Sequence, residues 1–296
     1  FFAANEYHEE RAPLEDAIVL DLHSRAVDDG PPHEPIRSLA DILRLVDVSQ
    51  PILANVSRTL VGRRCALSTP FGCVVWAEAV FDRLSIDGPQ TMALRLVGNG
   101  LDLSLRLEGI KFYIRTGEPR WPAGYLEFPF VQVTGRYGLR MENGVPMVQL
   151  DPASLSFELG NLSFDVPGAS VLLRDAILPG AQAQLESTID RAMRSLFLVE
   201  FGPLLSDTLA SIELLAASRV FTMPSGDVIS LDPKTVGFEA NPTRLQFKLA
   251  TTVLGPQAHD RPSAGIPVLA PVDPLDRLVG AADASVSLVL INQLLH

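Results

Sequence analysis

Hydrophobic positions between Asp41 and Gly62 recur at steps of three and four residues, which is the spacing of one face of an α-helix. These apolar positions run from Ile42 to Leu60 and continue past Pro51. They predict one amphipathic helix over this stretch, either straight or kinked at the proline.

The spacing then changes to an alternation of apolar and polar residues, which is typical of strands with one buried face. In the clearest run, leucines stand at every odd position from Leu101 to Leu107, with polar residues between them. The preceding Gly98-Asn99-Gly100 segment predicts a tight turn, because glycine and asparagine accept positive φ values. Further alternating runs cover residues 94–96, 131–134, 154–159 and 162–166.

Helical spacing returns in a long segment from about Leu178 to Leu215, and Gly202 and Pro203 within it predict a bend. One antiparallel sheet is therefore expected between two helical segments. The remaining predicted segments are strands at 228–231 and 245–249, a proline-rich crossing at 256–274, and a strand that leads into a helix at the end of the sequence.

Composition excludes some classes of partner. The chain has 296 residues, of which 47% are hydrophobic, and a formal net charge of -11. So acidic a protein should repel a phosphate backbone, and nucleic acid is not an expected partner. No uninterrupted apolar run reaches the roughly 18 residues that a membrane-spanning helix requires.

The sequence carries none of the motifs that identify common catalytic or metal sites. It has no HExxH, GxSxG or P-loop motif, and its five histidines are scattered. The acidic pairs Glu9-Glu10 and Asp28-Asp29 lack the spaced oxygen donors of a calcium loop. We therefore expect no enzyme activity, no catalytic residues, no metal and no cofactor.

Cys65 and Cys73 would close a short loop if they form a disulfide, which the loop-entropy model credits with about 2 to 3 kcal/mol of stabilisation. A pair of free, buried thiols is the alternative. Their spacing is not that of a CxxC redox or zinc motif.

The order of elements resembles that of a known family. The segment from Leu245 to His296, which includes the sequence SLVLIN at 287–292, resembles the link between the two barrels of the tubular lipid-binding (TULIP) superfamily. This superfamily includes bactericidal/permeability-increasing protein and lipid-transfer proteins. One feature differs from the family pattern. In the two-barrel members a disulfide ties a strand to the long second helix, whereas both cysteines of this chain precede the meander.

The resemblance, which covers roughly residues 41–296, implies an α+β fold in which a highly curved antiparallel sheet wraps around a long amphipathic helix. It divides this part of the chain into a tubular lipid-binding barrel at 41–217, linking strands with the proline-rich crossing at 218–282, and the first strand and helix of a second, incomplete barrel at 283–296. The acidic residues and prolines at 1–40 predict an irregular acidic leader before the barrel.

The resemblance also implies that the protein binds or transfers a lipid, with acyl chains or a sterol-like body held in an apolar tunnel. The expected partners are a phospholipid, fatty acid or sterol-like lipid, a membrane in transient contact, and a protein or further chain segment that completes the second barrel. The expected location is extracytoplasmic: periplasmic, outer-membrane-associated or secreted. The predicted tunnel-lining residues are Leu53, Val56, Leu60, Leu94, Leu96, Leu101, Leu103, Leu105, Leu107, Phe157, Leu159, Leu162, Phe164, Leu185, Ile189, Met193, Leu196 and Phe197.

Composition alone does not separate a tunnel from a solid core, because leucine and phenylalanine suit both. The alternative to lipid binding is a non-catalytic structural or interaction module whose barrel has a filled core. A tunnel needs no special polar motif, since each buried methylene of a guest contributes about 0.8 kcal/mol. The acidic charge favours neutral, zwitterionic or sterol-like guests over strongly anionic ones.

Overall fold

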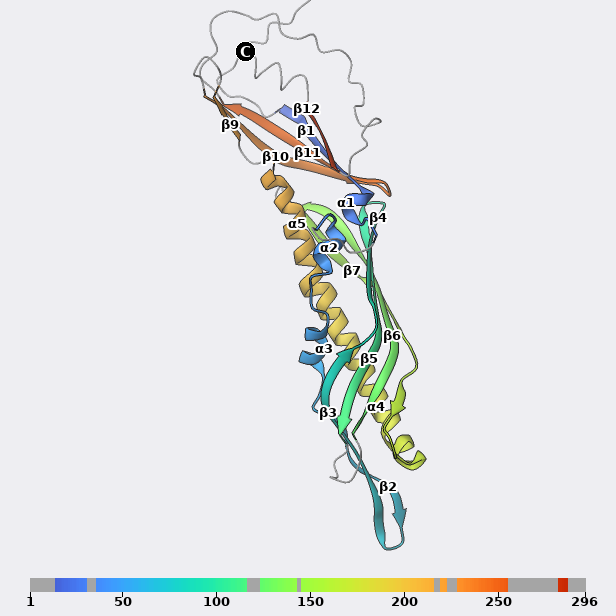
Figure 1. Cartoon of the computed structure of the whole chain (residues 1–296). Helices are drawn as coiled ribbons and strands as arrows, with labels where there is room; N and C mark the ends of the chain where they lie inside the picture. The colour runs from blue at the N-terminus through green and yellow to red at the C-terminus, as the bar shows by residue number, and fades with distance from the viewer. Residues whose placement is uncertain are drawn as a thin grey trace, which may run out of the picture.

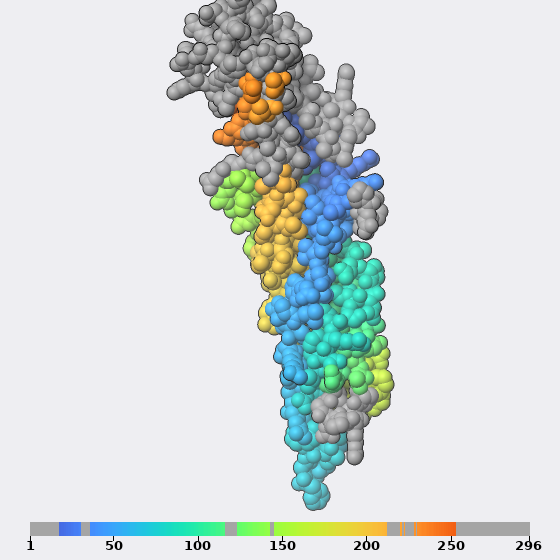
Figure 2. Space-filling model, turned by 60° about the vertical axis from the view of Figure 1, so that its left-hand side comes forward, coloured from blue at the N-terminus to red at the C-terminus, as the bar shows by residue number. Residues whose placement is uncertain are grey.

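The computed structural model describes residues 14–30, 36–115, 123–142, 145–215, 219–222, 228–254 and 282–286. These residues form an elongated body with two antiparallel sheets and a long helical segment (Figure 1). The smaller sheet lies at one end, and the hairpin of β2 (Thr59–Thr69) and β3 (Gly72–Ile86) projects at the other (Figure 1, Figure 2). None of the helices among these residues has the length and apolarity needed to cross a membrane.

The larger sheet is a strongly curled antiparallel sheet whose concave face packs on the helices (Figure 1). Its strand order is β2-β3-β5-β6-β7, with β4 paired to β5 and β8 paired to β6. The predicted meander is confirmed, whereas β2 and β3 were not expected from the sequence. The remaining strands are β4 (Gln90–Val97), β5 (Gly100–Arg115), β6 (Gly124–Glu142), β7 (Val145–Leu159) and β8 (Ser163–Asp165).

The turn between β4 and β5 is the tight hairpin that its glycines predict. Val97 pairs with Gly100, and Gly98 has a φ of 54° in the left-handed region. Gly100 is also required by packing, because a Cβ at this position would overlap the carbonyl oxygen of Tyr137 on β6. The turn is therefore fixed both by its own backbone and by the neighbouring strand.

The long helical segment consists of α4 (Val171–Ser195), one stretch of π-helix, η1 (Leu196–Phe201), and α5 (Gly202–Leu215). It begins earlier than predicted, because the Ser170 side chain accepts a hydrogen bond of 3.3 Å from the Leu173 amide and caps the first turn. The irregularity at its middle agrees with the predicted disruption near Pro203, which has no amide hydrogen to donate.

The single helix predicted from Asp41 to Leu60 is wrong. The structure instead has the short helices α2 (Leu39–Leu43) and α3 (Ser49–Asn55), and Leu60 belongs to β2. A new helix starts after Asp47, whose carboxylate accepts hydrogen bonds from the Ser49 amide at 3.0 Å and the Ser49 hydroxyl at 2.7 Å. Local hydrogen bonds of short polar side chains thus start a second helix within a stretch whose apolar spacing is that of one continuous helix.

The smaller sheet has the strand order β12-β1-β11-β10-β9 in the described part of the chain. Its strand β1 and the helix α1 (Ser24–Val27) replace the irregular structure expected for part of residues 1–40. Leu20 pairs with Phe247 of the distant strand β11, so the partner that stabilises β1 is far away in sequence. The strands are β1 (Leu14–His23), β9 (Arg219–Thr222), β10 (Val228–Ala240), β11 (Arg244–Leu254) and β12 (Ala282–Val286).

The strands predicted at 228–231 and 245–249 are confirmed within β10 and β11. The strand predicted near the end of the sequence corresponds to β12. The proline-rich crossing and the final helix, over 255–281 and 287–296, lie outside the described residues. The division into four parts, and the second barrel in particular, remain predictions.

Candidate functional site

Most of the predicted lining residues come together in the interior between the curled sheet and the helical segment. Leucines of β4 and β5 are buried on the sheet side, and residues of α4 and η1 are buried on the helix side. Val56, Phe157, Leu159 and Phe164 are partly buried and pack against this core. The buried members are Leu60, Leu94, Leu96, Leu101, Leu103, Leu105, Leu107, Leu162, Leu185, Ile189, Met193, Leu196 and Phe197.

Leu53 is the exception among the predicted lining residues. Its side chain is 39% exposed, whereas its neighbour Ile52 is fully buried in the core. The prediction assumed one continuous helix that would place Leu53 on the same face as Leu60. Because that stretch contains a short helix followed by a strand, the two leucines do not share a helical face.

A group of large aromatic and aliphatic side chains that the sequence pattern did not single out lies fully inside the core, and a change of face along two strands accounts for most of them. On β5 the buried positions are odd up to Leu107 and even from Ile110 onward, and Gly109 between them has a φ of 63°. On β6 the buried positions change from even at Phe128 to odd at Val131. The residues missed for this reason are Ile110, Phe112, Ile114, Leu126 and Phe128. Val131 and Val133 lie in an alternating run that the sequence did indicate, whereas Tyr137 on β6 and Phe201 on η1 were not singled out.

The two strands change face at the same level, because Glu108 pairs with Phe130 and Ile110 pairs with Phe128. Phe112 and Phe128 then meet edge to face, with ring centroids 6.4 Å apart. A left-handed glycine in a strand is the local sign of such an irregularity. In this chain, Gly109 followed by the apolar alternation from Ile110 to Ile114 was the available signal.

The helical segment packs directly on the sheet at the level of η1. A Cβ added at Gly135 of β6 would lie 3.0 Å from the Phe197 ring and 3.1 Å from the Leu150 side chain. Phe197 also stacks on Tyr137, with ring centroids 6.3 Å apart. At this level side chains fill the space between the sheet and the helix.

Two hydrogen bonds fix the helical segment to the sheet near its π-helical stretch. The buried Tyr137 hydroxyl donates to the Phe197 carbonyl at 2.8 Å, and burial raises the pKa of Tyr137. The Ser206 hydroxyl accepts from the Val148 amide at 2.9 Å and donates to the Gly202 carbonyl at 3.0 Å. These bonds satisfy polar groups that would otherwise be buried without a partner.

Thr188 places a hydroxyl group in the apolar stripe of α4. The residue is fully buried beside Ile189, and its Oγ1 atom has no hydrogen-bond partner among the described residues. A buried hydroxyl of this kind can donate to or accept from a polar atom of a bound molecule.

A cavity of about 370 Å³ lies on the outer face of the larger sheet. This location follows from the polar side chains that line the cavity, which alternate along the strands with the buried leucines. Arg136 and Asp102 form a two-pronged ion pair there, with N–O distances of 2.7 and 3.2 Å. This polar cavity is not the predicted apolar tunnel. It is lined by Ala93, Arg95, Asp102, Leu103, Ser104, Thr134, Gly135, Arg136 and Ser154.

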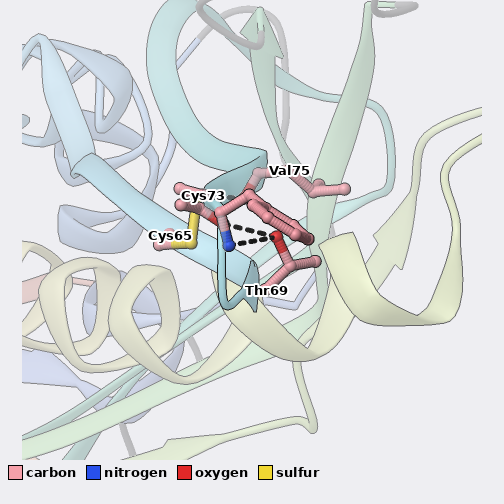
Figure 3. The surroundings of a disulfide bond; sticks show 6 residues. Cys65, Thr69, Cys73 and Val75 are labelled. Atoms are coloured by element: carbon pink, nitrogen blue, oxygen red, sulfur yellow. Dashed lines mark hydrogen bonds between the residues drawn. A yellow bond between two sulfur atoms is a disulfide. The ribbon is translucent and has the colours of Figure 1, made fainter.

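The disulfide that the sequence left open is present in the β2–β3 hairpin (Figure 3). It joins Cys65 and Cys73, whose Cα atoms are 5.7 Å apart. Beyond it, the Thr69 hydroxyl donates to the Gly72 carbonyl at 3.1 Å and accepts from the Phe71 amide at 3.3 Å. The end of the hairpin is therefore closed by a covalent bond and by a hydrogen-bonded turn.

No protein-family model matches the chain, and no curated protein matches its sequence. Among solved structures, the chain is similar to the crystal structure of lipopolysaccharide binding protein, with a TM-score of 0.52 and 14% sequence identity. The alignment covers 80% of this chain and 51% of the other, so this chain spans about half the length of that protein.

The similarity is one of fold. The curled antiparallel sheet with a long helix on its concave face is a TULIP-type α+β fold, as the order of elements predicted.

Proposed function

We propose that this protein binds lipid, with the apolar part of the guest held between the concave face of the larger sheet and the α4–α5 helical segment. The main support is the apolar surface that these two elements present to each other, built from leucines of β4 and β5 and from the buried stripe of α4. The fold shared with lipopolysaccharide binding protein is consistent with this function.

Binding would be passive, without a covalent step. Because η1 packs directly on Gly135, a guest enters only if the helical segment partly separates from the sheet. An acyl chain of about 16 carbons then contributes on the order of 12 kcal/mol before ordering costs. Difference in affinity between this interior and a membrane would set the direction of transfer.

The net charge of -11 favours neutral, zwitterionic or sterol-like guests. The Cys65–Cys73 disulfide supports a site of action outside the cytoplasm, since such bonds persist in oxidising compartments. Transient contact with a membrane, and a protein or chain segment that completes a second barrel, belong to the same proposal.

The experiment is mass spectrometry of lipid that remains bound to the purified protein, together with titration of a fluorescent fatty acid. We expect bound lipid and saturable displacement of the probe. Absence of both would contradict the proposal, and recovery of strongly anionic lipids alone would contradict the expected guest class.

Two neighbouring substitutions make the experiment specific to the interior. Leu103→Arg places a charge in the core, whereas Ser104→Arg places one on the outer face of the same strand. Loss of bound lipid in Leu103→Arg alone, with an unchanged circular dichroism spectrum, supports an interior guest. Unfolding of Leu103→Arg combined with no bound lipid in the wild type supports a plain core.

One observation favours the alternative of a structural or interaction module with a filled core, namely the close contact of Phe197 and Leu150 with Gly135. Under this alternative the wild type carries no lipid, and its melting temperature does not change when lipid is added. The same measurements therefore separate the two functions.

A further inference from the structure

The end of the β2–β3 hairpin exposes large apolar side chains that a folded chain ordinarily buries. Phe71, in the turn, is 101% exposed, Val74 is 62% exposed and Trp76 is 39% exposed. The Leu67 side chain on the facing strand is 38% exposed. Clustered apolar side chains of this size mark an interaction surface.

The part of the hairpin nearest its turn is basic, whereas the base of β3 carries Glu78 and Asp82 and the protein as a whole is acidic. Residues 56–77 contain Arg58, Arg63 and Arg64 and no acidic residue, while the whole chain has a net charge of -11. The Arg63 guanidinium lies over the Trp76 ring, 4.7 Å from its centroid. Positive charge and exposed aromatic surface are therefore combined at one place.

The hairpin is placed and stiffened so that its turn can reach a surface. It projects at one end of the elongated body, away from the smaller sheet (Figure 1, Figure 2). The Cys65–Cys73 disulfide joins its two strands near the turn (Figure 3). A cross-linked hairpin loses less conformational freedom when it binds than an open loop does.

The first turn of α4 adds to the same end of the molecule (Figure 1). Val171 is 62% exposed and Leu172 is 48% exposed there. Arg64 of β2 lies along the same helix, since a Cβ at Gly180 would be 3.6 Å from its guanidinium. The hairpin and the start of α4 thus form the end of the body.

We propose that the β2–β3 hairpin docks this protein onto the surface of a membrane that contains anionic lipid, with Phe71 and Trp76 inserted at the interface and Arg63 near the lipid phosphates. Aromatic side chains favour the boundary between water and lipid tails, and basic residues near the surface are attracted by anionic headgroups. The locally positive hairpin on an acidic body orients the molecule, because the rest of the chain is repelled.

This inference deepens the proposed function, on which the purpose of docking rests, by naming the surface that makes the membrane contact. It does not depend on what the interior holds. Docking can therefore fail while lipid remains bound inside, and an empty interior leaves docking intact.

The test is co-sedimentation of the full chain with vesicles of phosphatidylcholine alone or of phosphatidylcholine with a quarter of phosphatidylglycerol. We expect binding to the anionic vesicles that weakens with salt, and affinity about tenfold lower for Phe71→Ser. Arg63→Gln should weaken binding to the anionic vesicles only. The control Leu45→Ser removes an equally apolar side chain, 71% exposed in the turn between α2 and α3, and should bind as the wild type does.

Three results would overturn the proposal: a wild type that does not sediment with anionic vesicles, a Phe71→Ser variant that binds as well as the wild type, or an equal loss in Leu45→Ser. Mass spectrometry of the interior lipid is run on the same samples. Unchanged bound lipid in Phe71→Ser assigns the loss to docking rather than to the interior, and wild-type vesicle binding without interior lipid would reject the carrier function alone.

Discussion

The Tyr137 hydroxyl on β6 donates a hydrogen bond of 2.8 Å to the Phe197 carbonyl in η1, and the two rings stack at an interplanar angle of 13°. A π-helical stretch displaces backbone groups from their regular partners. Tyr137 supplies a partner from the sheet to one of these carbonyls. The irregular middle of the helical segment is therefore held at a defined height on the concave face.

Tyr137→Phe should destabilise the fold by about 1 to 3 kcal/mol, because the Phe197 carbonyl would remain buried without this donor. Urea unfolding followed by circular dichroism measures the change. Tyr113→Phe is the matched control, since Tyr113 is half-buried on β5, and it should cost less than about 0.5 kcal/mol. Equal stability of Tyr137→Phe and the wild type would show that the hydrogen bond contributes nothing net.

Alkaline pH should destabilise the protein partly through Tyr137. Burial raises the pKa of this phenol in the folded state above its ordinary value of about 10. The contribution to stability is complete below pH 10, and it falls as pH rises further, because the unfolded chain then releases the proton that the folded chain retains. Above pH 10 the wild type should lose up to about 1.4 kcal/mol more per pH unit than Tyr137→Phe does. Parallel pH profiles for the two proteins would contradict the shift.

Thr188→Val should stabilise the protein by about 1 kcal/mol. The substitution removes a buried hydroxyl that has no hydrogen-bond partner among the described residues, and it keeps the branched shape of the side chain. Thermal unfolding of delipidated protein measures the effect, with Thr134→Val on the outer face of β6 as the control. A clear loss of stability in Thr188→Val would reveal a partner for the hydroxyl.

Gly100→Ala should cost about 1 to 3 kcal/mol, since its new Cβ overlaps the Tyr137 carbonyl and the strands must move apart. Gly138 faces Gly100 across the β5–β6 ladder, yet a Cβ at Gly138 would be 3.9 Å from its nearest neighbour, the Gln149 carbonyl. Gly138→Ala is therefore the matched control and should be tolerated. If both variants unfold at the wild-type denaturant concentration, the close approach at Gly100 is not a constraint.

How far the sequence predicts this fold depends on whether the determining contacts are local. The alternation from Leu101 to Leu107 correctly predicted both the strand and its buried face, because successive side chains of a strand point to opposite faces and a half-buried strand therefore alternates apolar and polar residues. The face change beyond Gly109 was missed, since it takes coordinated irregularities on β5 and β6. Strand β1 was missed because its determining contacts are not local: its partners Phe247 and Ala284 lie more than two hundred residues away.

The residues of the candidate site were likewise predictable where the determining contacts are local, and not elsewhere. Residues on regular elements, such as Leu185 and Ile189 on α4, follow from helical spacing and are buried as expected. Leu53 was placed on the wrong side because the helix that contains it ends at Asn55, so Leu53 and Leu60 do not share a helical face. The exposure of Phe71 could not be predicted from the sequence, since a phenylalanine in a turn can either pack into the core or point into solvent.

Arg44 joins the segment that follows β1 to the larger sheet through hydrogen bonds to four groups. Its guanidinium donates to Asp41 at 2.7 Å and to Asp28 at 3.2 Å, and to the carbonyls of Gly30 and Met92 at 2.7 and 2.8 Å. The Arg44 side chain is 16% exposed, so water compensates poorly for lost bonds.

Arg44→Lys should therefore destabilise the protein by about 2 kcal/mol, because an ammonium group keeps the charge but cannot span partners that a planar fork reaches together. Arg136→Lys is the control: Arg136 also forms a two-pronged ion pair, with Asp102, but its side chain is 53% exposed, and its loss should cost less than about 1 kcal/mol. Urea unfolding of both variants measures the difference, and hydrogen exchange should locate the Arg44→Lys effect at residues 24–30 and on β4 around Met92. A loss in Arg44→Lys no larger than that in Arg136→Lys would mean that the charge alone, rather than the geometry of the guanidinium, holds this end of the sheet.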